Sequence, residues 1–166
     1  MTSVGVLALQ GDVREHLRTL ASLGAVAVAV KRPGDIEKVD ALVIPGGEST
    51  TIGKMAVRFE LLDPLRSAIE GGKPVYGTCA GLILLAGAVT DGDQPLLGVL
   101  DVVVRRNAFG RQNESFEADL EIAGIDEPFH AVFIRAPWVE KVGAEVEVLA
   151  KVDDHPVMVR KRNIIA

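Results

Sequence analysis

The sequence predicts an α/β fold: an open, mostly parallel sheet flanked by helices, with antiparallel or mixed strands added in the C-terminal half. In the first half, short apolar runs of strand length alternate with segments of helical periodicity. Strands separated by helices form right-handed parallel crossovers, and such sheets are covered on both faces. From about Leu97 the helical periodicity largely vanishes and strand-like runs follow one another. The second half should therefore add β structure to the first.

Turn and cap signals give the boundaries of the first-half elements. Asp12 with Glu15 three residues later is typical of a capping box and predicts a helix start. Gly24 stands where the C-terminal cap of that helix belongs. Further helices are expected over Leu61–Glu70 and from Ala80 onwards, and strands over Val4–Leu9, Ala25–Val30, Ala41–Ile44 and Pro74–Thr78.

The second half contains five strand-like runs. No linker rich in Pro, Gly or Ser, no internal repeat and no charge block divides the chain. Residues 1–166 are therefore expected to form a single domain. The expected strands are Leu97–Val104, Phe116–Ile122, Phe129–Ile134, Glu145–Val152 and Val157–Arg160.

Composition excludes several classes of protein. With 48% hydrophobic residues in 166, the chain can form a core and is not a disordered segment. A net charge of −5 argues against binding to nucleic acid or to an anionic membrane surface. No apolar stretch approaches the roughly 20 residues of a membrane span. The single cysteine, Cys79, excludes an internal disulfide framework and a multi-thiolate zinc site, and it favours a cytoplasmic protein.

The strongest local motif is Gly77-Thr78-Cys79-Ala80-Gly81, which lies between an expected strand and an apolar helix. This is the pattern of a nucleophile elbow, in which a sharp turn strains the nucleophile and the glycines allow helix and strand to approach closely. The helix N-terminus would favour a thiolate, and the Ala80 N–H would face an oxyanion. The alternative is that Cys79 is a small buried hydrophobic residue, as many lone cysteines are.

A second motif, Pro45-Gly46-Gly47-Glu48-Ser49, follows the expected third strand. Glycines at the carboxyl end of a parallel strand allow backbone N–H groups to approach a ligand. Taken alone, the motif is better explained by a plain turn followed by Ser49 as a helix N-cap. The lysine of a phosphate-binding P-loop is missing.

Together the two motifs resemble those of class I glutamine amidotransferase domains, which have a flavodoxin-like fold and a Cys–His–Glu triad. More narrowly, the chain resembles the glutaminase subunits of pyridoxal 5′-phosphate synthase. The similarity extends to the opening Val4–Gly11, to the run Arg105-Arg106-Asn107-Ala108-Phe109-Gly110-Arg111-Gln112 and to Phe133-Ile134-Arg135-Ala136-Pro137. These segments occur in the same order and span essentially the whole chain.

The resemblance implies hydrolysis of L-glutamine to L-glutamate and ammonia through a thioester on Cys79. It implies that Gly47 and Ala80 form the oxyanion hole. From the residues alone, Arg106 and Arg135 could equally be solvated strand charges, and Glu48 an acid in the first turn of a helix. The substrate-binding positions that the resemblance implies are Gly47, Glu48, Ser49, Arg106, Ile134 and Arg135.

The general base is the missing part of the expected triad. In the family, a His-x-Glu segment near the C-terminus supplies the histidine and the acid, after a strand that corresponds to about Arg160–Ala166. This sequence ends at Ala166, so we expect the native protein to continue further, or else this form to be catalytically impaired. None of the three histidines, His16, His130 and His155, is assigned as a replacement.

The resemblance also implies a partner, a (β/α)8-barrel synthase subunit that receives the ammonia. Pyridoxal phosphate would be the product of the pathway, so neither a cofactor nor a metal is expected here. Two alternatives stay open: an inactive glutaminase-like module that binds a partner, and a glutaminase of another pathway such as imidazole glycerol phosphate synthesis. The segments Arg105–Gln112 and Ile134–Pro137 argue against the second.

Overall fold

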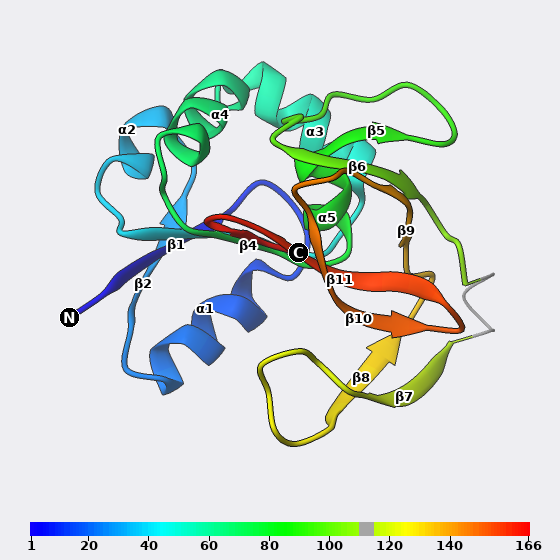
Figure 1. Ribbon diagram of the computed structural model, residues 1–166. Coiled ribbons are helices and arrows are strands. Elements are labelled where there is room, and N and C mark those ends of the chain that lie inside the picture. The colour runs from blue at the N-terminus through cyan, green and yellow to red at the C-terminus, as the bar shows by residue number, and fades with distance from the viewer. Residues whose placement is uncertain (110–114) are drawn as a thin grey trace.

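The computed structural model describes residues 1–109 and 115–166, and its central feature is a seven-stranded sheet with strand order β10-β11-β12-β4-β3-β1-β2 (Figure 1). Within it, β1, β2, β3, β4 and β12 are parallel. The α/β class predicted from the sequence is confirmed. The parallel strands are β1 (Ser3–Leu7), β2 (Val26–Val30), β3 (Ala41–Ile44), β4 (Val75–Gly77) and β12 (Ile164–Ile165).

Helices connect the parallel strands and lie on both sides of the sheet. In Figure 1, α1 lies on one side of the sheet, while α3, α4 and α5 lie on the other. Gly24, with φ of +81°, follows the C-cap of α1, as expected for a helix stop. The helices are α1 (Val13–Ser22), α2 (Pro33–Ile36), α3 (Ser49–Arg58), α4 (Leu62–Glu70) and α5 (Ala80–Leu85).

The C-terminal half adds the expected antiparallel and mixed strands. β10 (Glu147–Val152) and β11 (His155–Lys161) extend the central sheet in antiparallel fashion. A smaller sheet consists of β5 (Ala86–Val89), β6 (Leu100–Arg105) and β9 (Trp138–Val142), and β7 (Phe116–Leu120) pairs with β8 (Phe129–Phe133) as a hairpin. Segments far apart in sequence thus meet near the carboxyl end of β4.

Some local predictions were wrong. Asp12 precedes α1, but its side chain caps nothing, so the predicted capping box is absent; instead the Asp12 backbone N–H donates to the carbonyl of Gly46. The helix expected from Ala80 is present as α5, but it ends at Leu85, because Ala86 turns to an extended backbone with ψ of 155° and begins β5. Sequence reasoning also missed α2 and β9, which are short and carry weak periodicity.

Two apolar clusters hold these layers together. The larger lies between the central sheet and α3, α4 and α5, and it includes the fully buried Ile44, Leu65 and Leu84. The smaller joins the β7–β8 hairpin to β10 and contains Phe116 and Phe133, whose rings stack with centroids 4.8 Å apart. The hairpin is therefore anchored to the main sheet by its own side chains.

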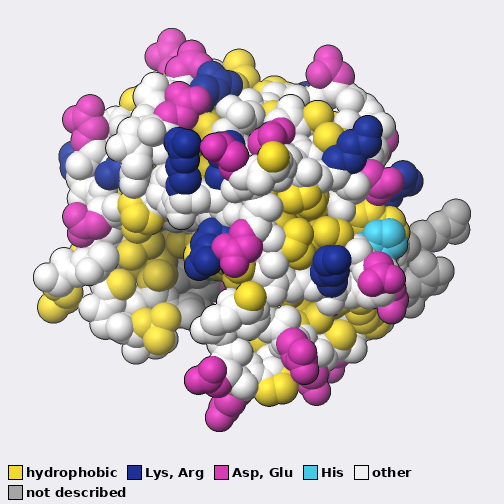
Figure 2. Space-filling view, in the orientation of Figure 1, with side chains coloured by type: hydrophobic (Ala, Val, Ile, Leu, Met, Phe, Trp, Pro, Cys, Tyr) yellow, Lys and Arg dark blue, Asp and Glu magenta, His cyan; other side chains and the backbone are white. Residues whose placement is uncertain are grey.

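The face drawn in Figure 2 is hollowed between the part formed by α1 and the part formed by the β7–β8 hairpin, with hydrophobic side chains around the hollow. Acidic and basic side chains are interspersed over the same face. Among the described residues, no helix combines the length and the hydrophobicity needed to cross a bilayer.

Candidate active site

Cys79 occupies the turn between β4 and α5 with φ of 50° and ψ of −101°, a left-handed backbone that is rare for a residue with a β-carbon. The strained turn expected of a nucleophile elbow is therefore present. A β-carbon on Gly77 would lie 2.9 Å from the backbone carbonyl carbon of Gly81, so glycine is required for β4 to approach α5 this closely. The turn leaves Cys79 exposed to solvent at the carboxyl end of the parallel sheet.

The glycine loop after β3 lies directly beside this elbow. A β-carbon built on Gly46 would lie 3.6 Å from Cβ of Cys79. Two bonds hold the loop: the Asp12 N–H donates to the Gly46 carbonyl at 3.0 Å, and the Glu48 N–H donates to Oε1 of Gln10 at 2.7 Å. The structure thus brings Gly47 to the same end of the sheet as Cys79 and Ala80.

Glu48, not Ser49, caps α3. Its carboxylate accepts hydrogen bonds from the backbone N–H groups of Thr50, at 3.3 Å, and Thr51, at 2.7 Å, and from the Thr51 hydroxyl at 2.9 Å. Partial burial acts to raise the pKa of Glu48, but the bonds from Thr51 and Thr50 outweigh it and leave the pKa below its ordinary value. The N-cap serine favoured from the residues alone was wrong, because the longer side chain reaches both free N–H groups.

Ser49 and Arg106 lie close together in the structure although they are far apart in the sequence. Arg106 donates to Thr50, the neighbour of Ser49, across 56 positions of the chain. Ser49, only 4% exposed, donates to Oε1 of Gln94 at 3.1 Å. Nη1 of Arg106 donates to the same oxygen at 3.0 Å and to the Thr50 hydroxyl at 3.2 Å. Arg106 is therefore not a solvated strand charge; its guanidinium lies against the start of α3.

Ile134 and Arg135 lie in the connection between β8 and β9, and both are exposed. Arg135 has a left-handed φ of 49°, which turns the chain at this point. Their neighbours Phe133 and Ala136 line the cavity beside Cys79, but Ile134 and Arg135 themselves do not. Ser49 and Arg106 are not among the residues that line this cavity either, so the structure places both pairs beside the cavity and does not join one pair to the other.

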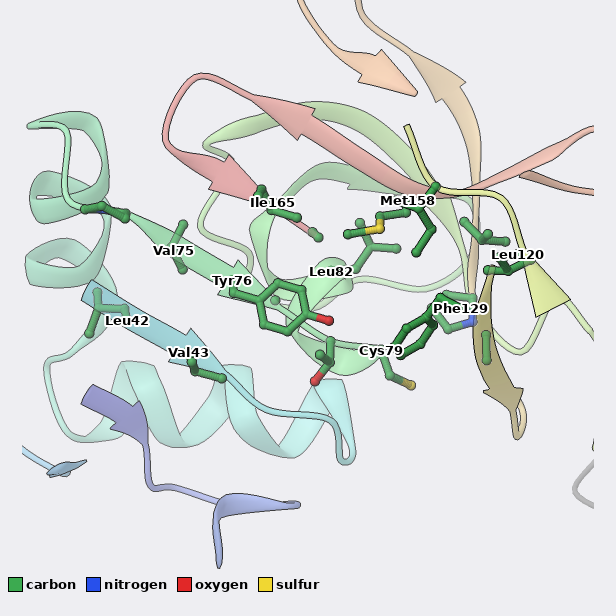
Figure 3. A pocket seen from close by; sticks show the side chains of 18 of the residues that line it. Leu42, Val43, Val75, Tyr76, Cys79, Leu82, Leu120, Phe129, Met158 and Ile165 are labelled. Carbon is green, nitrogen blue, oxygen red and sulfur yellow. The ribbon is translucent and has the colours of Figure 1, made fainter. Parts of the chain in front are cut away.

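A cavity of about 920 Å³ opens beside Cys79 (Figure 3). Most of its lining is apolar and comes from β3, β4, the C-terminal strands and the β7–β8 hairpin. Tyr76 of the central strand β4 is 43% exposed, and its ring points into this space; Phe129 of β8, 55% exposed, faces it from the hairpin (Figure 3). The thiol of Cys79 lies at one end of this apolar cavity.

This environment raises the pKa of the Cys79 thiol above its ordinary value. The main cause is desolvation by the surrounding walls, the Ala80 N–H acts in the opposite direction, and the negative charge of Asp12 raises the pKa further. The N–H of Ala80, at the start of α5, favours the thiolate as expected, but desolvation outweighs it and the net direction of the pKa is upward.

The three histidines all have other neighbours. Nε2 of His16 lies 3.2 Å from the hydroxyl of Thr78, next to the elbow. His130 contacts Asp119 and Glu117 on the hairpin, and the ring of His155 stacks on Trp138 with centroids 3.7 Å apart. Within the described residues, none of them hydrogen-bonds to Cys79, and no group of three His, Cys, Asp or Glu side chains is arranged to hold a metal ion.

Sequence reasoning missed Gln10 and Gln94, the two side-chain amides that contact the glycine loop and Ser49. One signal was available for the loop that carries Gln94: a glycine inside a helix, Gly53, often marks a close approach of another chain segment. Part of one motif, Gly110, Arg111 and Gln112, lies outside the described residues.

Comparisons with known proteins identify the family of this chain. The sequence pattern of the SNO glutamine amidotransferase family matches residues 6–166. A relative from Parafrankia sp., named pyridoxal 5′-phosphate synthase subunit PdxT, is 63% identical over 98% of this chain and 82% of its own length. The protein of the same name from Streptomyces coelicolor is 59% identical over 98% of this chain and 82% of its own length.

Solved structures agree as well. A crystal structure titled as a glutamine amidotransferase superposes with a TM-score of 0.93 at 52% identity, covering 98% of this chain and 87% of that one. The PurLQS structure from Thermotoga maritima shares the fold, with a TM-score of 0.72 at 17% identity over 99% of this chain and 84% of that one. With the elbow, the glycine loop and a family match over nearly the whole sequence, this chain belongs to the SNO glutamine amidotransferase family.

Proposed function

We propose that this chain hydrolyses the side-chain amide of L-glutamine to give L-glutamate and ammonia, and that the ammonia serves the synthesis of pyridoxal 5′-phosphate. The observation that carries this is the strained Cys79 at the end of β4, in a family of glutamine amidotransferases whose similar members are named subunits of pyridoxal 5′-phosphate synthase. Neither an inactive module nor another pathway is favoured by any contact in the site.

The chemistry begins with the thiolate of Cys79. It attacks the carbonyl carbon of the amide, and the N–H groups of Ala80 and Gly47 stabilise the negative oxygen that forms. The carbon–nitrogen bond then breaks, ammonia leaves with the proton that the thiol has given up, and a thioester remains on Cys79. Water cleaves the thioester, which releases glutamate and restores the thiol.

Substrate orientation falls to the polar groups around the start of α3 and to the β8–β9 connection. Gly47, Glu48 and Ser49 would contact the amino-acid end of glutamine from one side, and Arg106, Ile134 and Arg135 from the other. The contact from Glu48 would come from its carbonyl oxygen, which can accept a second hydrogen bond, since its carboxylate is committed to Thr50 and Thr51 and its N–H to Gln10. Fixing both ends of the substrate holds the amide over the sulfur.

The ammonia acceptor would be a (β/α)8-barrel synthase subunit, since the relatives are named as one subunit of a larger enzyme. Transfer inside a complex keeps ammonia unprotonated and therefore nucleophilic. A cytoplasmic location would keep the single thiol reduced, as the mechanism requires.

The test is release of glutamate from glutamine by the complex of the full-length protein with the synthase subunit, compared with Cys79→Ala. The substitution should abolish release while the two subunits still associate. Glutamate release by Cys79→Ala at the unmodified rate would overturn the assignment.

A further inference from the structure

The loop between β5 and β6 carries Gln94, whose carboxamide bridges two groups of the proposed glutamine site. Its Oε1 accepts from the Ser49 hydroxyl at 3.1 Å and from Nη1 of Arg106 at 3.0 Å. Because both bonds end at one oxygen, the hydroxyl and the guanidinium are held at fixed positions on either side of it. No other side chain in the described residues joins Ser49 to Arg106.

The orientation of this amide is set by chemistry. A guanidinium has only donors, so the group that faces Arg106 must be the carbonyl oxygen and not the NH₂. In this arrangement Nε2 of Gln94 and Nε of Arg106 are both buried, and neither makes a hydrogen bond within the described residues. Buried donors without partners are uncommon and destabilising, so an arrangement that keeps two of them calls for an explanation.

The loop is also held firmly enough to position its side chain. A β-carbon on Gly53 of α3 would lie 2.8 Å from the Pro95 carbonyl oxygen, so the loop passes directly over the helix. Nε of Arg66 donates to the Leu97 carbonyl at 2.8 Å, and Nη2 of Arg66 to that of Leu96 at 3.3 Å. On the other side of Gln94, Asp91 pairs with Nη2 of Arg106 at 3.2 Å.

From these contacts we propose that Gln94 is a positioning residue of the glutamine site, which sets where Ser49 and Arg106 present their polar groups to the amino-acid end of the substrate. The inference rests on the proposed function, since Ser49 and Arg106 contact glutamine only there. Gln94 does not touch the reacting atoms, so its loss should weaken substrate binding and leave the chemistry on Cys79 intact.

The experiment measures glutamine hydrolysis by the complex of full-length protein and synthase subunit. Gln94→Met removes the acceptor at nearly constant volume, and it should raise KM for glutamine about tenfold or more with kcat within about twofold. Gln94→Glu keeps an acceptor facing Ser49 and Arg106, and its KM should return most of the way to the wild-type value.

Arg66→Ala is the matched control, because it releases the same loop from α4 and leaves every bond of Gln94 in place. It should lower the melting temperature and change KM by less than about twofold, because the packing of Pro95 over Gly53 and the Asp91–Arg106 pair still hold the loop. If Arg66→Ala raises KM as much as Gln94→Met does, loop order alone matters and the positioning role is wrong. An unchanged KM in Gln94→Met would also overturn it.

A readout without turnover covers the case in which a variant folds poorly. Alkylation of Cys79 by a chloroketone that mimics glutamine should slow in Gln94→Met, while alkylation by iodoacetamide, which needs no amino-acid recognition, should keep its rate. Equal slowing of both reagents would contradict the proposal. Loss of hydrolysis in Cys79→Ala together with no effect of Gln94→Met would leave the proposed function standing and remove only this inference.

Discussion

The backbone of Gly81, at the start of α5, passes directly against the carbonyl oxygen of Ile44, the last residue of β3. A β-carbon at this position would collide with that oxygen. The contact joins two motifs that sequence reasoning treated separately, because Ile44 opens the glycine loop and Gly81 closes the elbow. It also explains how Gly46 comes so near to Cys79.

Gly81→Ala should therefore destabilise the fold by about 1–3 kcal/mol, the usual cost of adding a methyl group to a close-packed site. Urea unfolding of the variant and the parent measures this difference. Gly34→Ala is the matched control, since nothing lies within 4 Å of its would-be β-carbon. Its effect should stay within about 0.5 kcal/mol; equal losses in both variants would show that the Ile44 contact does not constrain the fold.

The Cys79 thiol should react slowly at neutral pH. Although Cys79 is exposed on one side, desolvation by the apolar walls raises the pKa of its thiol and the Asp12 charge adds to this. The reactive thiolate is therefore scarce, and alkylation by iodoacetamide should rise with pH, with an inflection above that of an ordinary thiol. Asp12→Asn removes the repelling charge and should move the inflection to lower pH. Mass spectrometry of the alkylated chain at a series of pH values measures both curves.

The control is the melting temperature of Asp12→Asn, which should equal that of the parent protein. The Asp12 side chain caps nothing, and its backbone N–H, which holds Gly46, is retained. An unchanged melting temperature with a shifted inflection would support the electrostatic explanation. An inflection at the ordinary thiol value in the parent protein would contradict it.

Glu48→Ala should cost about 1 kcal/mol of stability through loss of the α3 cap. The pKa of Glu48 is lowered in the folded protein, because the bonds from Thr51 and Thr50 outweigh the effect of burial. Its contribution is therefore fully present above the pKa of the unfolded chain and is lost as pH falls through the lower folded pKa. The difference in free energy of unfolding between the parent and Glu48→Ala should therefore shrink in acid. Denaturant unfolding at neutral and acidic pH measures this difference.

Glu70→Ala provides the comparison for this cap. Glu70 is an exposed acid in the last turn of α4, where a negative charge meets the negative end of the helix. Its removal should be neutral or slightly stabilising at neutral pH. A loss equal to that of Glu48→Ala would show that general charge, and not capping, determines the result.

His130 should titrate above an ordinary histidine, since its contacts with Asp119 at 2.9 Å and Glu117 at 3.0 Å raise its pKa. A raised folded pKa gives stability that is fully present below the unfolded pKa and is lost as pH rises through the folded pKa. Asp119→Asn and Glu117→Gln should each lower the pKa of His130 measured by NMR.

The indole N–H signal of Trp138 serves as the reference that the fold is retained, because it donates to Glu140 and neither substitution removes that bond. If neither substitution changes the titration curve of His130, the hairpin contacts do not persist in solution.

The local features of this protein follow from its sequence alone. Apolar period and glycine placement predict β3, α4 and the elbow around Cys79, because steric limits on neighbouring residues act within a few positions. The family resemblance rests on the same short motifs. Short elements such as α2 and β5 were missed, because too few residues are present for a helical or strand period of hydrophobicity to be recognised.

Tertiary structure decided which polar groups meet. Glu48, and not Ser49, caps α3. The hydroxyl of Ser49 instead donates to Gln94, which lies 45 positions further along the chain. Arg106, the residue after β6, donates to the same oxygen, while Ile134 and Arg135 remain at the rim. Such pairings depend on the close packing of the β5–β6 loop over Gly53 and of α5 against β3, and no local pattern in the sequence encodes distances across these contacts.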